Sequence, residues 1–489
     1  MKIYNRHERL PRNYTMMSDA YEFTMSMAYL LNNKQNEEAV FDVFFREVPN
    51  GGGYAVMAGL DQIIPYIENL KFSEQDLDFF RRNHYPEEFI TYLKNFKFTG
   101  SIYAIPDGTP VFPNEPLITV KAPLIEAQIV ETAILSIING SMEHATGARK
   151  IIEVTPKNVG VMEFGARRAA GVEDAINSSI YGIMAGCVGT SNVMAADMLN
   201  IPAMGTMAHS YIESFSSEYE SFLNYALTYP NNCMLLVDTI DTLRSGVPNA
   251  IRVFNYMKEK GISTEHIGIR IDSGDLAYLS KEARKMLDQA GFPNAKICLS
   301  NGLDDEKIEN LIVQGAYFDS LGVGDNISRP NGRMGCVYKE VALKINGVWV
   351  PKIKISNTTA KIINPDYKKL YRAYDKETGF AVADIMTRRN ETIKKEDLTI
   401  VNPNDFTKRK TLQHFELREL QQPIFIDGHL VYHDSEIMEK QQYCNAEMQT
   451  LYPEVKRRVN PQEYYVDGTE DYVKFRMEMI ENTRKLVRK

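Results

Sequence analysis

The sequence predicts an α/β protein whose middle third forms a mainly parallel sheet. Between residues 159 and 335, short apolar or β-branched runs alternate with longer amphipathic stretches. Near-continuous apolar strands separated by helical patterns are what a parallel sheet buried on both faces requires. Shorter β-type segments broken by Gly and Pro stand near residue 100 and beyond residue 335. These observations fit either a (β/α) barrel or a doubly wound sheet, with a second, β-rich domain.

Length and composition indicate an ordinary globular protein of two or three domains. The chain has 489 residues, of which 25% are charged and 44% hydrophobic, and a single core does not grow to that size. The formal net charge of −8 provides no overall positive field, so we expect neither a nucleic-acid binder nor a membrane-surface binder. An anionic small substrate stays open, because basic groups can gather locally.

Cysteine usage and hydropathy favour a cytoplasmic protein. The five cysteines lie far apart without a CxxC pair, which predicts neither a disulfide framework nor a zinc ribbon. They are Cys187, Cys233, Cys298, Cys336 and Cys444. The first fifteen residues lack the apolar core of a signal peptide. No stretch approaches the roughly eighteen uncharged apolar residues of a membrane span.

The first helix is expected over residues 18–31. Ser18 or Asp19 is its predicted N-cap, because either side chain can accept a hydrogen bond from a free amide. Tyr21 then lies in the first turn.

Strand patterns follow before the central region. We expect a strand over residues 39–45 and a small antiparallel β unit over residues 100–122, where Gly and Pro break short β-type pieces. Apolar residues at helical spacing over 124–139 predict a helix that leads into the next domain.

Six apolar runs are the expected parallel strands. They cover residues 159–164, 201–206, 233–238, 266–271, 295–300 and 317–323. In both candidate folds the functional edge is the carboxyl end of the strands. Nearly all the unusual polar residues of the region follow one of these runs, so we expect the site at that edge.

Hairpin-like segments return after residue 335. Asn346-Gly347, a favoured two-residue turn, separates two strand patterns, and residues 376–386 have the same character. We expect these segments to complete the β unit that begins near residue 100. The charged, Tyr-rich tail after residue 400 ends in a predicted helix over 473–489, whose cationic last turn suits the helix dipole.

The segment from Ile269 to Asp275 combines charges with a helix-opening turn. Arg270 and Asp272 alternate along a strand end, and Ser273-Gly274-Asp275 then opens a helix. Its amides and hydroxyl can bind a phosphate or a sugar hydroxyl, and its carboxylates can hold a ribose diol or Mg²⁺. An N-cap turn with an internal Arg–Asp pair explains the same residues without a ligand.

Two further strand ends carry candidate binding groups. Gly322 and Gly324 let the main chain before Asp325 approach a phosphate closely, although a plain β-turn has the same pattern. Phe164 can stack on a heteroaromatic ring, and Arg167 can grip a carboxylate bidentately. Solvated arginines on a surface helix are the alternative.

The sequence lacks the motifs of the common nucleotide and metal sites. It contains no GxxxxGK[ST] and no GxGxxG after a strand, so the common nucleotide folds are not indicated. No HExxH motif and no close His/Cys cluster supports a protein-bound transition metal. We therefore expect no dedicated metal site, and any metal to be Mg²⁺ that arrives with phosphates.

His209 is the strongest candidate for chemistry. It stands in the segment Gly205-Thr206-Met207-Ala208-His209-Ser210, where an apolar run ends and an imidazole appears with two hydroxyls. A neutral imidazole near pH 7 is a competent phosphoryl acceptor. A core or surface histidine without chemistry is the alternative, and the position at the functional edge favours the catalytic interpretation.

Five segments, in this order and spacing, closely resemble nicotinate phosphoribosyltransferases. They are DAYEFTM (19–25), EFGARRA (163–169), GTMAHSYIESF (205–215), IRIDSGDL (269–276) and GVGDNIS (322–328). The likeness spans the whole chain, and the extended tail is similar to that of the longer bacterial members. The segments are specific jointly rather than singly.

The resemblance implies a fold and an assembly. The fold is α/β, with an irregular (β/α) barrel domain, a discontinuous α/β sandwich domain and a C-terminal extension. Residues 1–123 and 336–400 are then expected to form the sandwich domain, 124–335 the barrel-like catalytic domain and 401–489 the extension. The implied assembly is a homodimer whose active sites receive residues from both subunits.

The resemblance also implies a reaction in NAD salvage. Nicotinate and 5-phosphoribosyl 1-pyrophosphate give nicotinate mononucleotide and pyrophosphate, with ATP as co-substrate and Mg²⁺ bound to the phosphates. His209 corresponds to the histidine that ATP transiently phosphorylates.

The resemblance assigns the remaining site residues to the two main substrates. Those implied for nicotinate are Tyr21, Phe164, Arg167, Thr206, Ser210 and Arg270, with Tyr21 and Phe164 sandwiching the ring. Those implied for phosphoribosyl pyrophosphate are Asp272, Ser273, Gly274, Asp275, Gly302, Gly322, Gly324 and Asp325. Related sequences often carry a hydroxyl residue at the position of Asp325.

Other functions stay open from the residues alone. A sister enzyme could use quinolinate, which needs more basic residues for its second carboxylate, or nicotinamide, which gains nothing from a bidentate arginine. A barrel aldolase or a sugar-phosphate-binding protein explains the phosphate turns but leaves His209 without a role.

Overall fold

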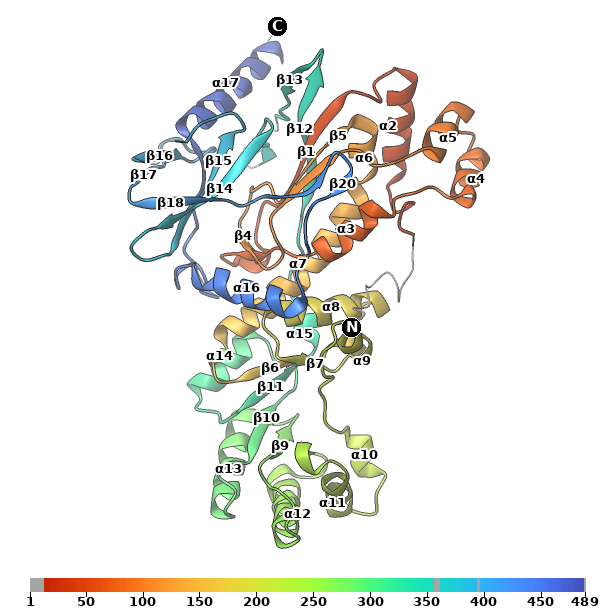
Figure 1. Cartoon of the computed structure of the whole chain (residues 1–489). Helices are drawn as coiled ribbons and strands as arrows, with labels where there is room; N and C mark the ends of the chain where they lie inside the picture. The colour runs from red at the N-terminus through yellow and green to blue at the C-terminus, as the bar shows by residue number, and fades with distance from the viewer. Residues whose placement is uncertain (1–12, 356–360, 394–395, 488–489) are drawn as a thin grey trace. The chain divides into compact units, whose positions relative to one another are not determined.

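The chain folds into two compact units (Figure 1). One of them, the half-barrel unit, comprises His144–Asn331; the other, the two-sheet unit, comprises the described residues up to Glu143 and from Gly332 onwards. The computed structural model describes residues 13–355, 361–393 and 396–487. Residues 1–12, which make up most of the N-terminal segment without signal-peptide character, lie outside the described residues. The last two residues of the predicted terminal helix, 488 and 489, also lie outside them. The domain limits at residues 123, 335 and 400 stay a prediction.

The half-barrel unit contains the parallel sheet that the apolar runs predict. In the described part of the chain its six strands follow the order β7-β6-β11-β10-β9-β8, and all neighbours are parallel. The strands are β6 (Gly160–Glu163), β7 (Gly189–Thr190), β8 (Cys233–Leu236), β9 (Ile267–Ile271), β10 (Lys296–Leu299) and β11 (Ser320–Val323). β7 and β8 are the two edges, so the sheet is a curled half-barrel rather than a closed ring of paired strands.

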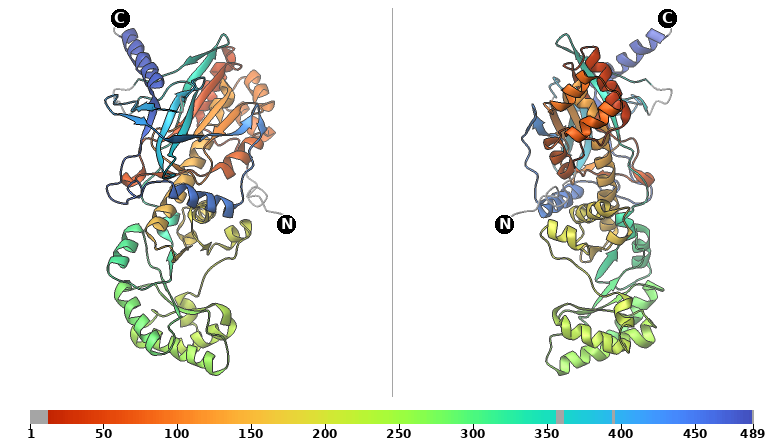
Figure 2. Two further views of the ribbon diagram at one scale, coloured as in Figure 1. Left: turned by 60° about the vertical axis from the view of Figure 1, so that its left-hand side comes forward. Right: turned by 90° about the vertical axis from the view of Figure 1, so that its right-hand side faces the viewer.

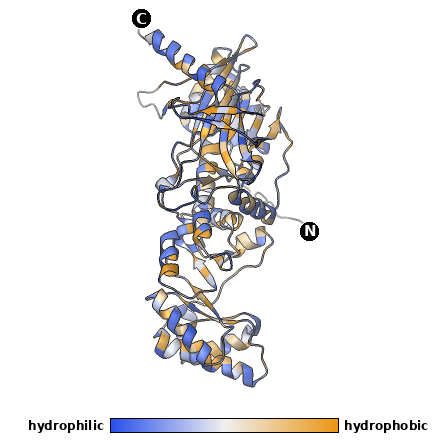
Figure 3. Cartoon of the chain, turned by 90° about the vertical axis from the view of Figure 1, so that its left-hand side faces the viewer, coloured by the Kyte–Doolittle hydropathy of each residue, from blue (hydrophilic) through white to orange (hydrophobic). Residues whose placement is uncertain are grey.

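Helices flank this sheet and cover its apolar strands. They are η2 (Ala166–Arg168), α8 (Val172–Ala185), α9 (Val193–Met198), α10 (His209–Glu213), α11 (Glu218–Thr228), η3 (Pro230–Asn232), η4 (Thr242–Gly246), α12 (Val247–Glu259), α13 (Leu276–Gln289), α14 (Asp305–Val313) and α15 (Asp325–Ser328). α12, α13 and α14 follow one another along one side of the sheet (Figure 2). Figure 3 shows both hydrophilic and hydrophobic residues on these helices, as amphipathic helices that bury one face require.

The strand predicted over residues 201–206 is wrong. The segment touches the sheet through one β-bridge, between Thr190 and Ala203, and the edge strand is the two-residue β7 instead. Pro202 has no amide hydrogen to donate to a ladder, and Gly205 disfavours extended pairing. The segment therefore runs beside the sheet edge without joining it as a strand.

The two-sheet unit contains a seven-stranded antiparallel sheet among its described residues. Its order is β13-β12-β1-β5-β3-β19-β20. The strands are β1 (Glu38–Phe44), β3 (Ser101–Ala104), β5 (Ile118–Pro123), β12 (Val337–Ile345), β13 (Val348–Pro351), β19 (Gln422–Ile426) and β20 (His429–Leu430). β12 pairs with β1 and β1 with β5, so the segment after residue 335 joins the sheet that the N-terminal strands begin. Asn346 and Gly347 form the β12–β13 turn with positive φ angles of 51° and 80°.

The second sheet of this unit is built largely from the C-terminal segment. Its order is β17-β16-β21-β15-β14-β18. The strands are β14 (Lys368–Asp375), β15 (Ala381–Arg388), β16 (Leu398–Val401), β17 (Arg409–Leu412), β18 (Phe415–Glu419) and β21 (Val466–Thr469). A short two-stranded sheet pairs β2 (Ala55–Val56) with β4 (Pro110–Val111). The tail after residue 400 is therefore β-rich before it reaches its final helix.

The helices of the two-sheet unit include the predicted first and last helices. They are α2 (Ala20–Leu31), η1 (Pro49–Gly51), α3 (Leu60–Glu68), α4 (Glu74–Arg82), α5 (Glu87–Lys94), α6 (Leu124–Ile129), α7 (Glu131–Val154, which continues into the half-barrel unit), α16 (Ile437–Gln449) and α17 (Glu470–Val487). Asp19 is the N-cap of α2 by position, but its side chain makes no capping bond. Ser18 does not cap the helix either, because its Oγ donates to the carbonyl of Ile129.

All five cysteines are buried, and none of them forms a disulfide bond within the described residues. Among the described residues, no helix combines the length and apolar character needed to cross a bilayer.

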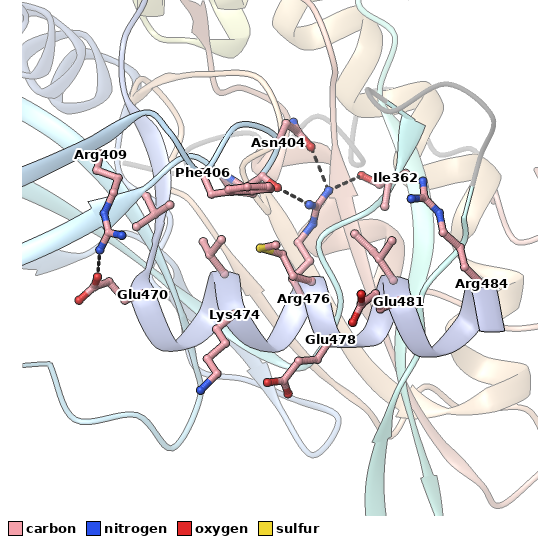
Figure 4. Close-up of a pocket in the computed structure, with 15 residues that line it drawn as sticks. Ile362, Asn404, Phe406, Arg409, Glu470, Lys474, Arg476, Glu478, Glu481 and Arg484 are labelled. Atoms are coloured by element: carbon pink, nitrogen blue, oxygen red, sulfur yellow. Dashed lines mark hydrogen bonds and ion pairs between the residues drawn. The ribbon is translucent and has the colours of Figure 1, made fainter. Parts of the chain in front are cut away.

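Arg476 fixes α17 to the loops beside the second sheet. Its guanidinium is buried and donates to the carbonyl oxygens of Pro403 and Ile362 and to the side chain of Asn404 (Figure 4). The surrounding pocket has a volume of about 710 Å³ and also exposes Phe406. Since Arg476 satisfies buried carbonyls, its role is to hold the helix in place.

We expect Arg476→Met to lower the free energy of unfolding by about 3 kcal/mol, because each buried carbonyl left without a donor costs roughly 1–3 kcal/mol. Urea denaturation of the variant measures this change. The control is Lys474→Met on the same helix, where the side chain is exposed and the expected change is within about 0.5 kcal/mol. Equal stability of the two variants would contradict this role.

Candidate active site

The polar groups of the half-barrel unit gather at the carboxyl ends of its strands. Each of β6, β8, β9, β10 and β11 is followed at once by a side chain or turn that contacts the next group along the edge. Because the strands are parallel, these ends lie on one edge of the sheet. The site is best followed from β8 across to β6.

His209 begins α10 and is held by the carboxylate that follows β8. Its Nε2 lies 3.3 Å from Oδ1 of Asp238. The Asp238 side chain is 1% exposed, whereas the imidazole is 40% exposed. One ring nitrogen is therefore held by a buried anion, while the remainder of the ring is partly exposed.

The same carboxylate collects the turn that follows β9. Oδ2 of Asp238 accepts hydrogen bonds from the amide of Asp272, at 3.1 Å, and from Oγ of Ser273, at 2.5 Å. A buried carboxylate is stable only when its oxygens are paired in this way. Asp238 therefore links His209 directly to the predicted phosphate-binding turn.

Arg270 lies on β9 beside the segment that carries His209. Its Nη1 donates to Oγ1 of Thr206 at 2.7 Å, so the structure brings these two predicted residues together. The Nε of Arg270 and the Oγ1 of Thr239 are buried, and no described residue forms a hydrogen bond with either. Buried polar atoms are almost always paired, so both atoms have capacity for one further hydrogen bond.

The turn after β9 links β9 to β10 and also caps the next helix, α13. Oδ1 of Asp272 accepts from Oγ of Ser300 at 2.5 Å, which joins the ends of β9 and β10. Asp275 is the N-cap of α13, where its side chain accepts from the amide of Tyr278. The N-cap alternative is thus correct for Asp275, but Arg270 bonds Thr206 rather than an aspartate. Gly274 adopts a positive φ of 78°, which favours glycine.

Phe164 follows β6 and lies against the end of β11. A Cβ on Gly322 would come within 2.6 Å of Cδ2 of the Phe164 ring. Any side chain at position 322 would therefore collide with the ring in its present position. Glu163 is fully buried and accepts from Ser179 and Thr190, as well as from the amide of Gly165. The strand end that carries Phe164 is therefore rigid.

The two loops after β6 and β11 approach each other closely. A Cβ on Gly165 would meet the carbonyl oxygen of Gly324 at 2.6 Å. Asp325 pairs with Arg168, with 3.3 Å between Nε and Oδ1. The neighbouring Arg167, which is predicted to bind nicotinate, is exposed.

Gly302 lies in a left-handed turn after β10. Its φ is 55°, and Nζ of Lys307 donates to its carbonyl oxygen at 2.7 Å. The exposed ammonium of Lys307 is therefore a cation at a predicted phosphate-binding position.

Two predicted residues form none of the contacts described above. Ser210 is exposed in the first turn of α10. Tyr21 lies in the first turn of α2 in the two-sheet unit and is 45% exposed. Burial, and then the charge of Glu131, raise the pKa of the Tyr21 hydroxyl above its ordinary value, so this residue offers a neutral phenol ring.

Sequence reasoning missed three residues that the structure brings to the edge: Asp238, Ser300 and Lys307. Asp238 and Ser300 are the last residues of the predicted runs 233–238 and 295–300, and this position at the carboxyl end of a strand is the signal that could have identified them. Lys307 stands in the first turns of α14, and its contact with Gly302 depends on how the turn folds. Within the part of the chain that the structure describes, no group of three or more His, Cys, Asp or Glu side chains is placed to hold a metal ion.

Comparison with known proteins gives matches along the whole chain. The nicotinate phosphoribosyltransferase N-terminal domain matches residues 16–139, the nicotinate phosphoribosyltransferase family matches residues 159–377, and the C-terminal domain matches residues 367–476.

Similar proteins cover nearly the full length. Nicotinate phosphoribosyltransferase of Bacillus subtilis is 40% identical over 96% of this chain and 96% of its own. Nicotinate phosphoribosyltransferase 1 of Arabidopsis thaliana is 33% identical over 92% of this chain and 91% of its own. The crystal structure of human nicotinic acid phosphoribosyltransferase matches with a TM-score of 0.82 and 25% identity, over 95% of this chain and 99% of that one. The family that the five sequence segments resemble is thus the family to which this chain belongs: the nicotinate phosphoribosyltransferases.

Proposed function

We propose that this enzyme transfers the 5-phosphoribosyl group of 5-phosphoribosyl 1-pyrophosphate to nicotinate and couples the transfer to ATP through His209. Nicotinate phosphoribosyltransferase activity, a step of NAD biosynthesis, follows from the family. The observation that supports the coupling is the buried Asp238 carboxylate, which holds His209 and the Asp272-Ser273 turn together. A phosphoryl group carried by His209 would then lie beside the predicted phosphate turn.

The contact with Asp238 supports Nδ1 of His209 as the nitrogen that reacts. Because an ionised carboxylate only accepts hydrogen bonds, Nε2 of His209 carries the proton that faces Asp238. The lone pair is then on Nδ1, which attacks the γ-phosphorus of ATP while the bond to ADP breaks. Asp238 stabilises the positive charge that develops on the ring. Hydrolysis of the phosphohistidine releases phosphate and restores the free imidazole.

Arg270 and Thr206 are proposed to receive the carboxylate of nicotinate. The unpaired Nε of Arg270 offers a donor in a buried setting, where an ionic hydrogen bond is strong. Phe164 supplies an apolar ring face at the same edge, and Ser210 and Arg167 stay predicted contacts. Tyr21 stays predicted as the second ring of the sandwich.

The turns after β9, β10 and β11 are proposed to hold the phosphoribosyl pyrophosphate. Glycosyl transfer develops positive charge at the ribose, so the enzyme must fix the pyrophosphate and hold the pyridine nitrogen in line. Gly274, Gly302 and Gly324 allow close approach of the main chain, and Lys307 adds a cation. Because Asp325 pairs with Arg168, its proposed contribution is to orient the loop.

Mg²⁺ fits these residues as a companion of the substrate phosphates. The donors at the edge are oxygens, which Mg²⁺ prefers, and the Asp272 carboxylate is the residue that would hold the ion together with the substrate phosphates. Bound there, the ion would neutralise charge on the leaving pyrophosphate.

We also propose that the half-barrel is the irregular (β/α) barrel of the family. The segment from Ala203 to His209 lies beside β7 at one end and contacts the carboxylate after β8 at the other. It thus runs from β7 to β8, the two outermost strands of the sheet, without forming a strand itself.

A homodimer with shared active sites is part of the proposal. The support for it is the family to which the chain belongs, and the exposed Val172 and Val193 at the starts of α8 and α9 are candidates for the contact surface. The expected compartment is the cytoplasm, where ATP is available.

The test is release of pyrophosphate from 5-phosphoribosyl 1-pyrophosphate in the presence of nicotinate, nicotinamide or quinolinate, with and without ATP. We expect nicotinate to give product at least about 100-fold faster than the other two: nicotinamide leaves the ionic contact at the half-buried Arg270 unmade, and quinolinate needs a further basic residue for its second carboxylate, and either defect costs about 3 kcal/mol. ATP should be hydrolysed alongside. A preference for quinolinate or nicotinamide would assign the chain to a sister activity.

A methyl group at Gly322 should displace the Phe164 ring. For Gly322→Ala we expect the KM for nicotinate to rise about tenfold, since aromatic contacts of this kind contribute about 0.5–1.5 kcal/mol. Steady-state kinetics measure the change. Gly335→Ala is the control, because an added Cβ there meets nothing within 4 Å. An unchanged KM in Gly322→Ala would remove Phe164 from the pyridine site.

A further inference from the structure

His144 bonds two acceptors at once in the interior of the half-barrel unit. It lies on α7 and is 4% exposed. Its Nδ1 is 2.9 Å from the carbonyl oxygen of Ile327, and its Nε2 is 2.8 Å from Oδ1 of Asp174. A carbonyl and an ionised carboxylate both accept, so both bonds form together only when the ring carries a proton on each nitrogen. The geometry thus describes an imidazolium.

The charges around the ring favour this state. Burial alone would raise the pKa of Asp174, but the hydrogen bonds from His144 and from the amide of Ala170 hold it below its ordinary value, and Arg329 adds a nearby positive charge. Asp174 stands in the first turn of α8, where the helix dipole also favours a carboxylate. His144 therefore faces an anion.

The two partners of His144 lie on the helices that follow the two loops of the proposed site. Ile327 lies in α15, directly after the Gly322–Asp325 loop. Asp174 accepts from Ala170 at 2.7 Å and so fixes the segment between Arg168 and α8. The loops also touch each other, through the Arg168–Asp325 pair and the close approach of Gly165 to Gly324.

We propose that His144 is a positioning residue for phosphoribosyl pyrophosphate: it clamps the loops after β6 and β11 to α7 and to each other. It contacts no substrate itself. The clamp sets the separation of the two loops before the substrate arrives, so less ordering remains for binding. This inference rests on the proposed use of these loops for the phosphoribosyl substrate.

The first test is His144→Gln, whose amide can donate to one acceptor in place of two. We expect the KM for 5-phosphoribosyl 1-pyrophosphate to rise about tenfold, because small displacements of binding loops have effects of this size or larger. The kcat should stay within about twofold, since His209 on α10, Asp238 after β8 and Arg270 on β9 are untouched. Calorimetric titration with the same substrate, which needs no turnover, should show the same loss of affinity.

The matched control is Arg284→Met. Arg284 is also buried in this unit and donates to the carbonyl oxygens of Phe292 and Ala295, before the amino end of β10. Its loss removes comparable hydrogen bonds at the opposite edge of the sheet. The control should lose stability but keep the KM of the parent protein.

Asp174→Asn is the second variant, for use if His144→Gln does not fold. Asp174→Asn preserves the shape of a half-buried side chain but removes the charge that holds the imidazolium, and it should raise the same KM. If the parent protein forms product and neither variant changes this KM or the calorimetric affinity, the clamp is wrong. If the parent protein forms no product with nicotinate, the proposed function itself fails.

Discussion

His209→Ala should lose ATP-coupled turnover almost completely. The variant has no imidazole to accept the γ-phosphoryl group, so we expect hydrolysis of ATP during nicotinate turnover to fall to background. Product formation should fall by at least about 100-fold, the usual scale for removing a group that takes part in the chemistry. Parallel assays of ADP and nicotinate mononucleotide measure the two rates.

The control for this variant is His266→Ala. His266 precedes β9 at the amino end of the sheet and is exposed, so both rates should match those of the parent protein. If His209→Ala retained ATP hydrolysis coupled to product, the phosphoryl carrier would be another residue, and the bond to Asp238 would be structural only.

Arg270→Met should produce the second large effect. The substitution keeps much of the side-chain volume but removes the charge and the donors, including the one that holds Thr206. We expect kcat/KM for nicotinate to fall about 100-fold, corresponding to about 3 kcal/mol for an uncompensated buried carboxylate. The residual rate with nicotinamide, which has no carboxylate, should change little.

Arg252→Met serves as the comparison, because Arg252 is an exposed arginine on α12 whose guanidinium bonds Asn249. Arg270→Lys adds a second comparison: it retains the charge but lacks the planar fork of donors. Equal losses of kcat/KM with nicotinate and nicotinamide in Arg270→Met would show that the arginine supports the fold rather than the carboxylate.

The parallel sheet could be predicted because its strands are short apolar runs that end in polar turns. β8, β9, β10 and β11 lie within the predicted runs, and each begins or ends within a few residues of the expected limit. The exception, 201–206, has the same apolar character. Its failure to pair depends on Pro202 and on the position of β7, which is only two residues long, and no local pattern in the sequence identifies such a strand.

The sequence identified site residues whose own side chain suggests a role in binding or chemistry. It did not identify residues whose role is to hold other site residues in position. His209, Arg270 and Phe164 lie at the predicted edge. Asp238 was overlooked because an aspartate after a strand is common, and its importance comes from the three groups that converge on it in space.

Some predicted residues have structural duties that only the three-dimensional arrangement reveals. Asp275 caps α13, and Asp325 pairs with Arg168. His144 was not considered from the sequence at all, since its two acceptors are 30 and 183 positions away along the chain. Contacts of that separation are set by topology and not by spacing.

The central claim is that ATP phosphorylates His209, and the most direct test is to locate the phosphate. The protein is incubated with ATP labelled at its γ-phosphorus, digested at neutral or alkaline pH, and the labelled peptide is identified. The account predicts an acid-labile phosphate on the peptide that carries residues 205–215, lost when nicotinate and 5-phosphoribosyl 1-pyrophosphate are added. An acid-stable phosphate, a label on another peptide, or equal labelling of His209→Ala would contradict it.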